Sequence, residues 1–194
     1  MYESIKHHIE SKIGSKISDN DFGKFNNLTQ QIAFKKKELL LKEGQICKHL
    51  YYVYKGLVYS SYTDHEGLVH VIQIAKEDFW ISDLFSFFSG KAALYDITTL
   101  EATHLIAISK DNFEKACQEI PVFEHFFRIL IQNAYVAQQY RTTQARISDA
   151  KTRYQNLIEN HPEIIQRVPQ YLIASFLGIQ PQSLSRIRKS QFLK

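Results

Sequence analysis

The stretch RVPQYLIASFLGIQPQSLSRIRKS, from Arg167 to Ser190, decides how the end of this chain folds. Pro169 suits the first turn of a helix, where a missing backbone N–H costs nothing, and Gln170 to Leu177 then runs without a helix breaker. Gly178 ends that run, because glycine tolerates the positive φ of a tight turn. A second helix over Pro181–Lys189 again opens with proline. The stretch therefore predicts two short helices joined by a tight turn.

The apolar residues of this stretch have the spacing of a helix-turn-helix. Such a motif needs apolar residues where its helices clasp, a small residue where they cross and a glycine in the turn. The residues that meet these needs are Ile173, Ala174, Leu177, Gly178, Ile179, Leu184 and Ile187. A purely structural helical hairpin is the alternative, but it does not explain why the second helix has no acidic residue on its open faces.

The open faces of the predicted second helix carry groups suited to DNA. These residues are Pro181, Gln182, Ser183, Ser185, Arg186, Arg188 and Lys189. Arg186 can donate two parallel hydrogen bonds to guanine O6 and N7, and Gln182 can pair with adenine N6 and N7. The two serines, Arg188 and Lys189 suit phosphate contacts or orienting roles. We expect the start of this helix to enter the major groove of double-stranded DNA.

The charge distribution agrees with such a partner without deciding it. From Arg141 onward the chain has nine Lys and Arg against three Asp and Glu, a balance of +6, whereas the whole chain is at +4 and the remainder therefore at −2. No acid follows Glu163. A basic end on a slightly acidic body is typical of a nucleic-acid contact. A solvated basic tail would give the same count.

Upstream, apolar residues mark a long helix. Their alternating spacings of four and three residues are those of a seam that packs against a partner helix. The seam residues are Phe123, Phe127, Leu130, Ala134 and Ala137. We expect a homodimer, and the alternative is a helix that packs only on its own domain. Ser148 and Asp149 form a capping pair before a further helix that Pro162 ends.

The middle of the chain has the texture of an all-β domain. Short β-rich runs occur between Ile32 and Ser109, and Asp64–Gly67 is typical of a hairpin loop. The runs are Glu38–Leu41, Leu50–Tyr54, Leu57–Thr63, Leu68–Ile74, Ile97–Leu100 and Leu105–Ile108. Their regular spacing predicts a sandwich or jelly roll. The aromatic stretch Asp78–Phe88 predicts a short helix or lid over the mouth of the roll.

Together these patterns predict an α+β chain with four parts. Two short helices fill residues 1–31, with Ser18 and Asp19 as a helix cap. The β-roll covers 32–110, the connecting and dimerisation helices cover 111–147, and the helix-turn-helix domain covers 148–194. No apolar run approaches the roughly 18 residues of a membrane span, and no signal peptide is evident, so we expect a cytoplasmic protein.

The order of β-roll, long helix and helix-turn-helix resembles the CRP/FNR superfamily over nearly the whole chain. Gln182, Ser185 and Arg186 resemble that family's E-x-x-S-R motif, with Gln182 in the place of glutamate. The resemblance implies a homodimeric transcription regulator, with RNA polymerase as a further partner. Because glutamine prefers adenine where glutamate prefers cytosine, the family's usual half-site should not be assumed. We also expect no terminal β-wing after the recognition helix.

The resemblance further implies a cyclic-nucleotide pocket, but its phosphate-binding residues are missing. The family's cassette has a Gly-Glu pair and then Arg-Ser/Thr-Ala, where this chain has Trp80–Leu84 and Ala92–Asp96. Without a cation, a buried phosphodiester would be unpaired at a cost of several kcal/mol. We predict that cyclic AMP does not bind tightly.

Another effector is the first alternative for this region. Its candidate pocket residues are Trp80, Ser82, Asp83, Ala93, Leu94 and Tyr95. A core role for the aromatic residues there is the competing interpretation. An empty roll acting as a scaffold, or a cyclic-nucleotide response through a non-standard pocket, stays open.

Other classes of function find less support. Jelly rolls include metal-dependent cupin enzymes, but His49, His65, His70 and His104 form no H-x-H pair. Cys47 and Cys117 lie too far apart in the sequence for a C-x-x-C motif, and no catalytic constellation or metal site stands out. We therefore expect no enzyme and no certain cofactor. A ligand-binding module without DNA binding remains the competing hypothesis.

Overall fold

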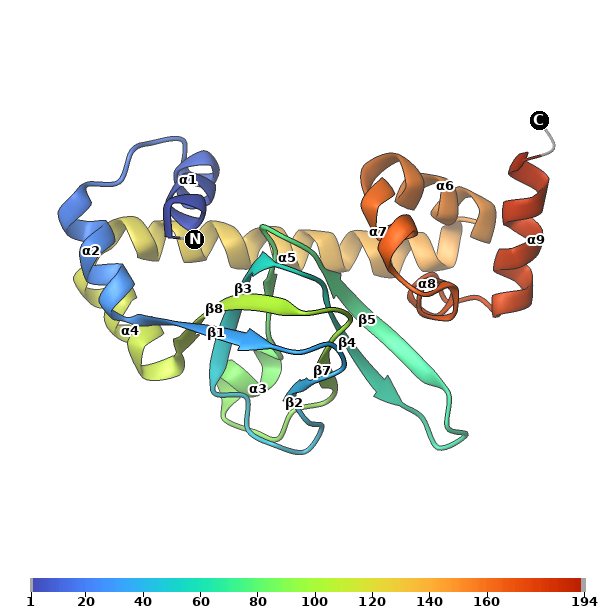
Figure 1. Cartoon of the computed structure of the whole chain (residues 1–194), viewed down its shortest axis with the longest axis horizontal. Coiled ribbons are helices and arrows are strands. Elements are labelled where there is room, and N and C mark those ends of the chain that lie inside the picture. The colour runs from blue at the N-terminus through green and yellow to red at the C-terminus, as the bar shows by residue number, and fades with distance from the viewer. Residues whose placement is uncertain (1, 193–194) are drawn as a thin grey trace.

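The computed structural model describes residues 2–192, with side chains described through Ser190. One long helix, α5 (Pro121–Ile147), runs along the molecule (Figure 1). The N-terminal helices lie at one end of α5, the β-roll lies against its middle, and the C-terminal helices lie at its other end. Among residues 2–192, no helix is both long and apolar enough to cross a membrane. The chain is thus the α+β arrangement that the sequence predicts.

The other helices are short and belong to three groups along the chain. They are α1 (Tyr2–Ile13), α2 (Asp19–Asn27), α3 (Leu84–Ser89), α4 (Lys110–Glu119), α6 (Ala150–Asn160), α7 (Pro162–Arg167), α8 (Gln170–Phe176) and α9 (Pro181–Phe192). The predicted caps are confirmed: Ser18 accepts a hydrogen bond from the backbone of Asp21, and Asp149 accepts one from that of Thr152.

Two four-stranded antiparallel sheets face each other in the roll. The strands are β1 (Thr29–Phe34), β2 (Leu39–Leu41), β3 (His49–Lys55), β4 (Val58–Thr63), β5 (Val69–Ala75), β6 (Trp80–Ile81), β7 (Asp96–Thr99) and β8 (Thr103–Ser109). One sheet has the order β1-β8-β3-β6 and the other β2-β7-β4-β5. The strands β4 and β5 form the predicted hairpin, in which Thr63 pairs with Val69.

The structure contains two strands that the sequence patterns did not predict. The first, β1, begins at Thr29, so the roll starts before residue 32. The second, β6, and the helix α3 together form the stretch predicted as a short helix or lid. All six predicted strands are present, with ends that differ by at most two residues.

The main core lies inside the roll and continues under α5. Phe123 and Phe127 are buried in it, and the Phe123 ring stacks on Phe25 at a centroid distance of 4.0 Å. Leu130 packs against the same core. These three predicted seam residues therefore face the core of their own chain. Their spacing of four and three residues is real, but it reports packing within the chain.

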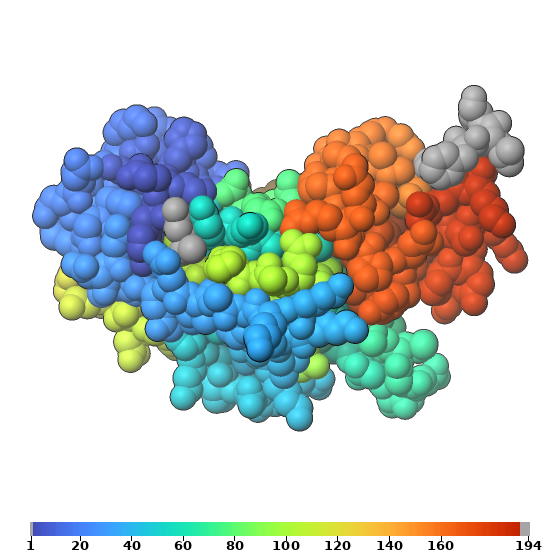
Figure 2. Space-filling model, in the orientation of Figure 1, coloured from blue at the N-terminus to red at the C-terminus, as the bar shows by residue number. Residues whose placement is uncertain are grey.

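A second core joins the roll to the C-terminal helices. Leu57, Val71 and Ile74 of the roll are buried in one cluster with Leu172 and Ile173 of α8. The space-filling view shows the orange helices α7 and α8 directly against the roll, with the β4–β5 hairpin projecting beside them (Figure 2). The helix-turn-helix is therefore packed on the outer face of a sheet.

Candidate nucleic-acid interface and effector region

The C-terminal helices form the predicted helix-turn-helix. Helix α8 ends after Phe176, and Gly178 takes a φ of +67°, as the turn requires. The backbone N–H of Ile179 donates to the Ala174 carbonyl at 3.0 Å, which closes the turn. The predicted clasp is confirmed by burial of Ile173, Ala174, Leu177 and Leu184, with Ile179 and Ile187 packed against them.

An arginine fixes the turn to the end of the long helix. Arg153, on α6, donates from Nε to the Leu177 carbonyl at 3.2 Å and from a second nitrogen to the Ser148 carbonyl. Ser148 is the C-cap residue that directly follows α5. The guanidinium therefore holds the entrance of α9 close to the hinge between α5 and α6. In the sequence, Arg153 stood out only as one of the basic residues of this end.

The predicted DNA-contacting residues all lie on α9, but their exposure differs. Pro181, Gln182, Ser185, Arg186 and Lys189 are exposed, while Ser183 and Arg188 are half-buried. In the part of the chain that the structure describes, no protein group pairs with the side chains of Gln182, Arg186 and Lys189. Unpaired donors on a helix without acids can bind phosphate or base edges.

The exposed half of α5 presents an apolar stripe that differs from the predicted seam. Ala134 and Ala137 are exposed, and the large exposed apolar residues of α5 are Tyr135, Val136, Tyr140 and Ile147. Their exposed fractions are 65 %, 64 %, 58 % and 71 %. At 100° per residue Val136, Tyr140 and Ile147 share a face, which lies well over 100° around the helix from Ala134, whereas Tyr135 lies about 100° from both Val136 and Ala134. Because residues 132–140 are all exposed, this apolar face and the predicted Ala134 and Ala137 are both open.

The predicted effector residues do not line one common pocket. Trp80 is buried against Tyr52, Phe126 and Phe127, in the layer between the roll and α5. Ala93 is buried, whereas Leu94 is 55 % exposed. Trp80 is therefore a core residue in this structure.

The remaining candidates, around α3, are hydrogen-bonded to one another. Asp83, fully buried, accepts from the backbone N–H of Ser86 at 2.9 Å and from that of Leu94 at 2.7 Å. The Ser82 hydroxyl donates to the His49 carbonyl, and the Tyr95 hydroxyl donates to the Ser82 carbonyl at 3.2 Å. Burial raises the pKa of Tyr95, so its hydroxyl stays a neutral donor. An internal carboxylate thus occupies the Ser86 N–H in the first turn of α3 and the N–H of Leu94 beyond that helix.

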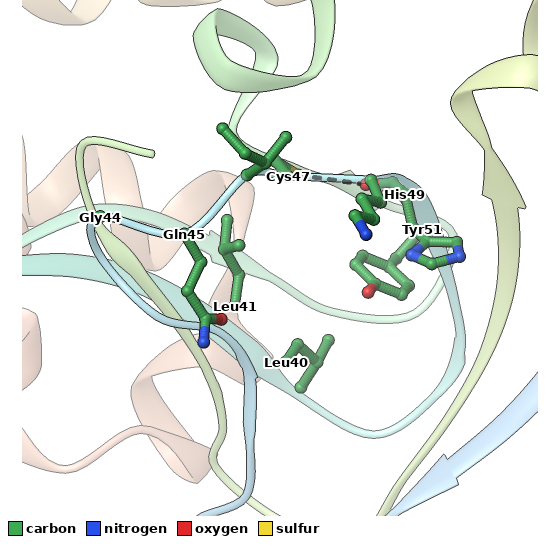
Figure 3. A pocket seen from close by; sticks show the side chains of 9 residues that line it. Leu40, Leu41, Gly44, Gln45, Cys47, His49 and Tyr51 are labelled. Carbon is green, nitrogen blue, oxygen red and sulfur yellow. Dashed lines mark hydrogen bonds between the residues drawn. The ribbon is translucent and has the colours of Figure 1, made fainter. Parts of the chain in front are cut away.

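A cavity of about 570 Å³ lies elsewhere, between β2, β3 and the loop that joins them (Figure 3). Its lining includes Leu40, Leu41, Gln45 and Tyr51, and none of the predicted pocket residues. Cys47 contributes to the wall, with its thiol donating to the His49 carbonyl at 3.4 Å. No sequence signal singled out this cavity, because its wall combines an ordinary strand with an ordinary loop.

The histidines do not form a metal centre. His70 contacts the Asp64 carboxylate at 2.6 Å and stacks on Tyr62, whereas His65 is exposed on the same hairpin. Within residues 2–192, no group of three or more His, Cys, Asp or Glu side chains could hold a metal ion.

Comparison with known proteins shows which folds this architecture is similar to. Residues 31–120 match the family model of the cyclic nucleotide-binding domain. CLP of Xanthomonas campestris, described as a c-di-GMP-responsive global regulator, is 14 % identical, with 91 % of this chain and 92 % of that chain covered and a TM-score of 0.71. FixK2 of Bradyrhizobium japonicum is also 14 % identical, with 85 % of each chain covered and a TM-score of 0.71.

A third similar structure is described as a member of the CRP/FNR family. A transcriptional regulator of the CRP/FNR family from Eubacterium rectale is 12 % identical, with 91 % of this chain and 84 % of that chain covered and a TM-score of 0.68. No curated protein matches the chain. At these identities the likeness establishes the fold.

Proposed function

We propose that the protein is a homodimeric transcription regulator, because residues 31–120 match the family model of the cyclic nucleotide-binding domain and 91 % of the chain shares the fold of a CRP/FNR-family regulator. In this proposal α9 reads double-stranded DNA in the major groove. RNA polymerase, as a further partner, and a cytoplasmic location rest on the family resemblance and the sequence. The expected lack of a β-wing concerns residues beyond α9, outside the described part of the chain.

The unpaired donors of α9 are the observation that carries the proposal. Gln182 and Arg186 are exposed, and no protein group competes for their hydrogen bonds in the described chain. Arg186 suits guanine and Gln182 suits adenine, so we propose that the half-site contains both bases. Lys189 and the half-buried Arg188 suit the flanking phosphates.

A gel-shift titration against genomic DNA fragments tests the proposal. We expect sequence-selective retardation that weakens as salt rises, because phosphate contacts release counterions. Retardation that depends on salt but not on sequence would support non-specific binding only. An absence of retardation, with and without small-molecule extract, would favour a ligand-binding module.

The apolar stripe of α5 supports the homodimer. Val136, Tyr140 and Ile147 expose large apolar side chains on one face, and soluble helices bury such faces against a partner. We propose that this face meets the α5 of a second copy.

Two aspartate substitutions separate this face from the seam predicted by sequence. We expect Val136→Asp to dissociate the dimer, because it buries an unpaired charge, and Ala134→Asp to leave it assembled. Sedimentation velocity of both variants measures the outcome. The reverse result would restore the sequence seam, and a wild-type monomer would contradict the homodimer.

The α3 region supports the proposal that cyclic AMP does not bind tightly. The Asp83 carboxylate already accepts the backbone donors of Ser86 and Leu94, so a phosphodiester would meet a buried like charge. We expect calorimetry with cyclic AMP to give millimolar affinity or none. Micromolar binding would contradict the proposal.

A further inference from the structure

The helix-turn-helix closes an open edge of the roll. Strand β5 is the last strand of its sheet, so one row of its backbone groups has no neighbouring strand. The hydroxyl of Ser175, on α8, donates to the Val69 carbonyl at 2.6 Å and accepts from the Val71 N–H at 2.9 Å. These bonds occupy edge groups that would otherwise need water or another strand. They tie α8 to the roll at one point.

A second, ionic contact lies at the end of α7. Arg167 donates to both carboxylate oxygens of Glu77 at 2.8 and 2.9 Å, and to Glu101 at 2.5 Å. Glu77 also accepts the backbone N–H of Gly56 at 2.8 Å. Gly56 has a φ of +110°, and a Cβ there would lie 2.5 Å from Thr103 Oγ1. The roll therefore holds the Glu77 acceptor in a tight turn.

The protonation behaviour of this contact agrees with a permanent ion pair. Burial alone would raise the pKa of Glu77, but the hydrogen bonds from Arg167 and Gly56 lower it to about 2. The hydrogen bonds from Arg167 to Glu77 and Glu101 raise the pKa of Arg167. Both groups stay charged at neutral pH, so a change of pH near neutrality does not break the Arg167–Glu77 ion pair.

Several directional contacts cross this junction: besides the Ser175 bonds and the Arg167 pairs, Lys76 contacts Glu163 of α7 at 2.5 Å. Between α5 and α6 only Ser148 and Asp149 are non-helical, which is short but not rigid. The second core is apolar, and apolar burial has no preferred direction. A bidentate arginine–carboxylate pair, in contrast, fixes an angle as well as a distance.

We infer that Arg167 is a positioning residue for DNA reading: through Glu77 and Glu101 it sets the angle at which each protomer presents α9. This inference rests on the proposed function. With Arg167 in place, Gln182 and Arg186 remain exposed, so the docked arrangement leaves the reading face open. In a dimer, this angle decides how far apart the two recognition helices meet the DNA.

Selection from a random-sequence duplex library tests the inference and requires no chosen target sequence. The full-length wild type and Arg167→Ala are each used to enrich the library, and the spacing between selected half-sites is compared. We expect one dominant spacing for the wild type and a broadened distribution for the variant. Affinity for the best wild-type duplex should fall about three- to tenfold, since the pair is partly exposed. A variant that was only less stable would select the same spacing.

Two controls separate positioning from phosphate contact and from loss of charge. Arg128→Ala removes an arginine whose polar contacts, among the described residues, are with Gln132 and His125 of α5, and it should leave spacing and affinity unchanged. The slope of log affinity against log salt should be unchanged in Arg167→Ala, whereas loss of a phosphate contact would reduce its magnitude by about one. A reduced slope would overturn the positioning role.

A double-mutant cycle and hydrogen exchange complete the test. Glu77→Ala should broaden the spacing as Arg167→Ala does, and the double variant should add little. The Val71 amide, which Ser175 holds, should exchange faster in both single variants. An unchanged spacing in Arg167→Ala would overturn the inference while the proposed function stands. A wild type that selects no sequence at all would overturn the proposed function. In that case, an unchanged exchange rate of the Val71 amide in Arg167→Ala would show that Arg167 does not hold the helix-turn-helix against the roll either.

Discussion

Helix α9 and the region around α3 treat their polar groups in opposite ways. On α9, Gln182, Arg186 and Lys189 point to solvent without a protein partner in the described chain. Around α3, Ser82, Asp83 and Ser86 are buried, and each takes part in internal hydrogen bonds. Folding can leave exposed donors free, because water satisfies them, but it must pair buried ones. The difference leaves the donors of α9 available for a ligand and closes the site at α3.

The largest effect is expected when the buried hydrogen bonds around α3 are removed. Asp83→Ala should lower the free energy of unfolding by about 3 kcal/mol, because it leaves the buried Ser86 N–H and the partly buried Leu94 N–H unpaired. Chemical denaturation measures the loss. Asp149→Ala is the matched control, since that exposed cap holds only Thr152 and should cost about 1 kcal/mol. Equal losses of unfolding free energy in the two variants would show that burial does not determine how much Asp83 stabilises the fold.

On α9, removal of Arg186, the proposed base-reading group, should have a large effect on binding and little on stability. Arg186→Ala should weaken specific DNA binding by about 1–3 kcal/mol and relax the preference at one base. Competition titrations with single-base variants of a selected duplex measure both. A uniform loss over all sequences would mean that Arg186 contacts phosphate.

A smaller effect is expected for the lysine that follows. Lys189→Ala should weaken all duplexes about equally and reduce the magnitude of the salt slope by about one, because a single phosphate contact is lost. Anisotropy titrations at several salt concentrations give the slope. Selective loss at one base position would contradict the assignment.

The smallest effect concerns the paired carboxylate at the junction. Glu77 has a pKa of about 2 in the folded protein against a usual value of 4.5, so its stabilisation is complete above pH 4.5 and is lost as pH falls towards 2. Because the side chain is 37 % exposed, screening limits the effect to about 1 kcal/mol. Denaturation of wild type and Glu77→Gln should converge as the pH is lowered. A constant difference would indicate a role independent of charge.

The helix-turn-helix could be predicted because its signals are local. Pro169, Gly178 and Pro181 act within one or two turns of the backbone, and the structure places them at the cap, the turn and the start of α9. Strand β1 was missed because its sequence, TQQIAF, begins with polar residues at the edge of a sheet. Strand β6 has only two residues, too few for a pattern.

The face of α5 shows where periodicity stops being informative. Spacings of four and three residues identify a helix with a buried side, but they do not say what covers it. The aromatic rings of Phe123 and Phe127 are covered by α2 and α4. The free stripe around Val136 became visible only when those contacts were known.

Sequence could predict the residues of the candidate site, but it could not predict the contacts that hold distant segments together. The exposed donors of α9 follow from one helix, so sequence alone could name them. In contrast, Asp83 meets the Leu94 amide eleven positions away, and Arg167 meets Glu77 ninety positions away. Such contacts depend on the folded topology, and neither residue carries a motif that marks its partner.

The core shared by the roll and α8 has a consequence for biosynthesis. Ile74 is translated ninety residues before Ile164, one of the residues that bury it. At 5–20 residues per second, the outer face of that sheet waits roughly 5–20 seconds for its cover. During that interval Leu57, Val71 and Ile74 offer an apolar surface beside the open edge of β5. The nascent chain is therefore most exposed to chaperones, or to aggregation, after the roll has formed and before α7 and α8 leave the ribosome.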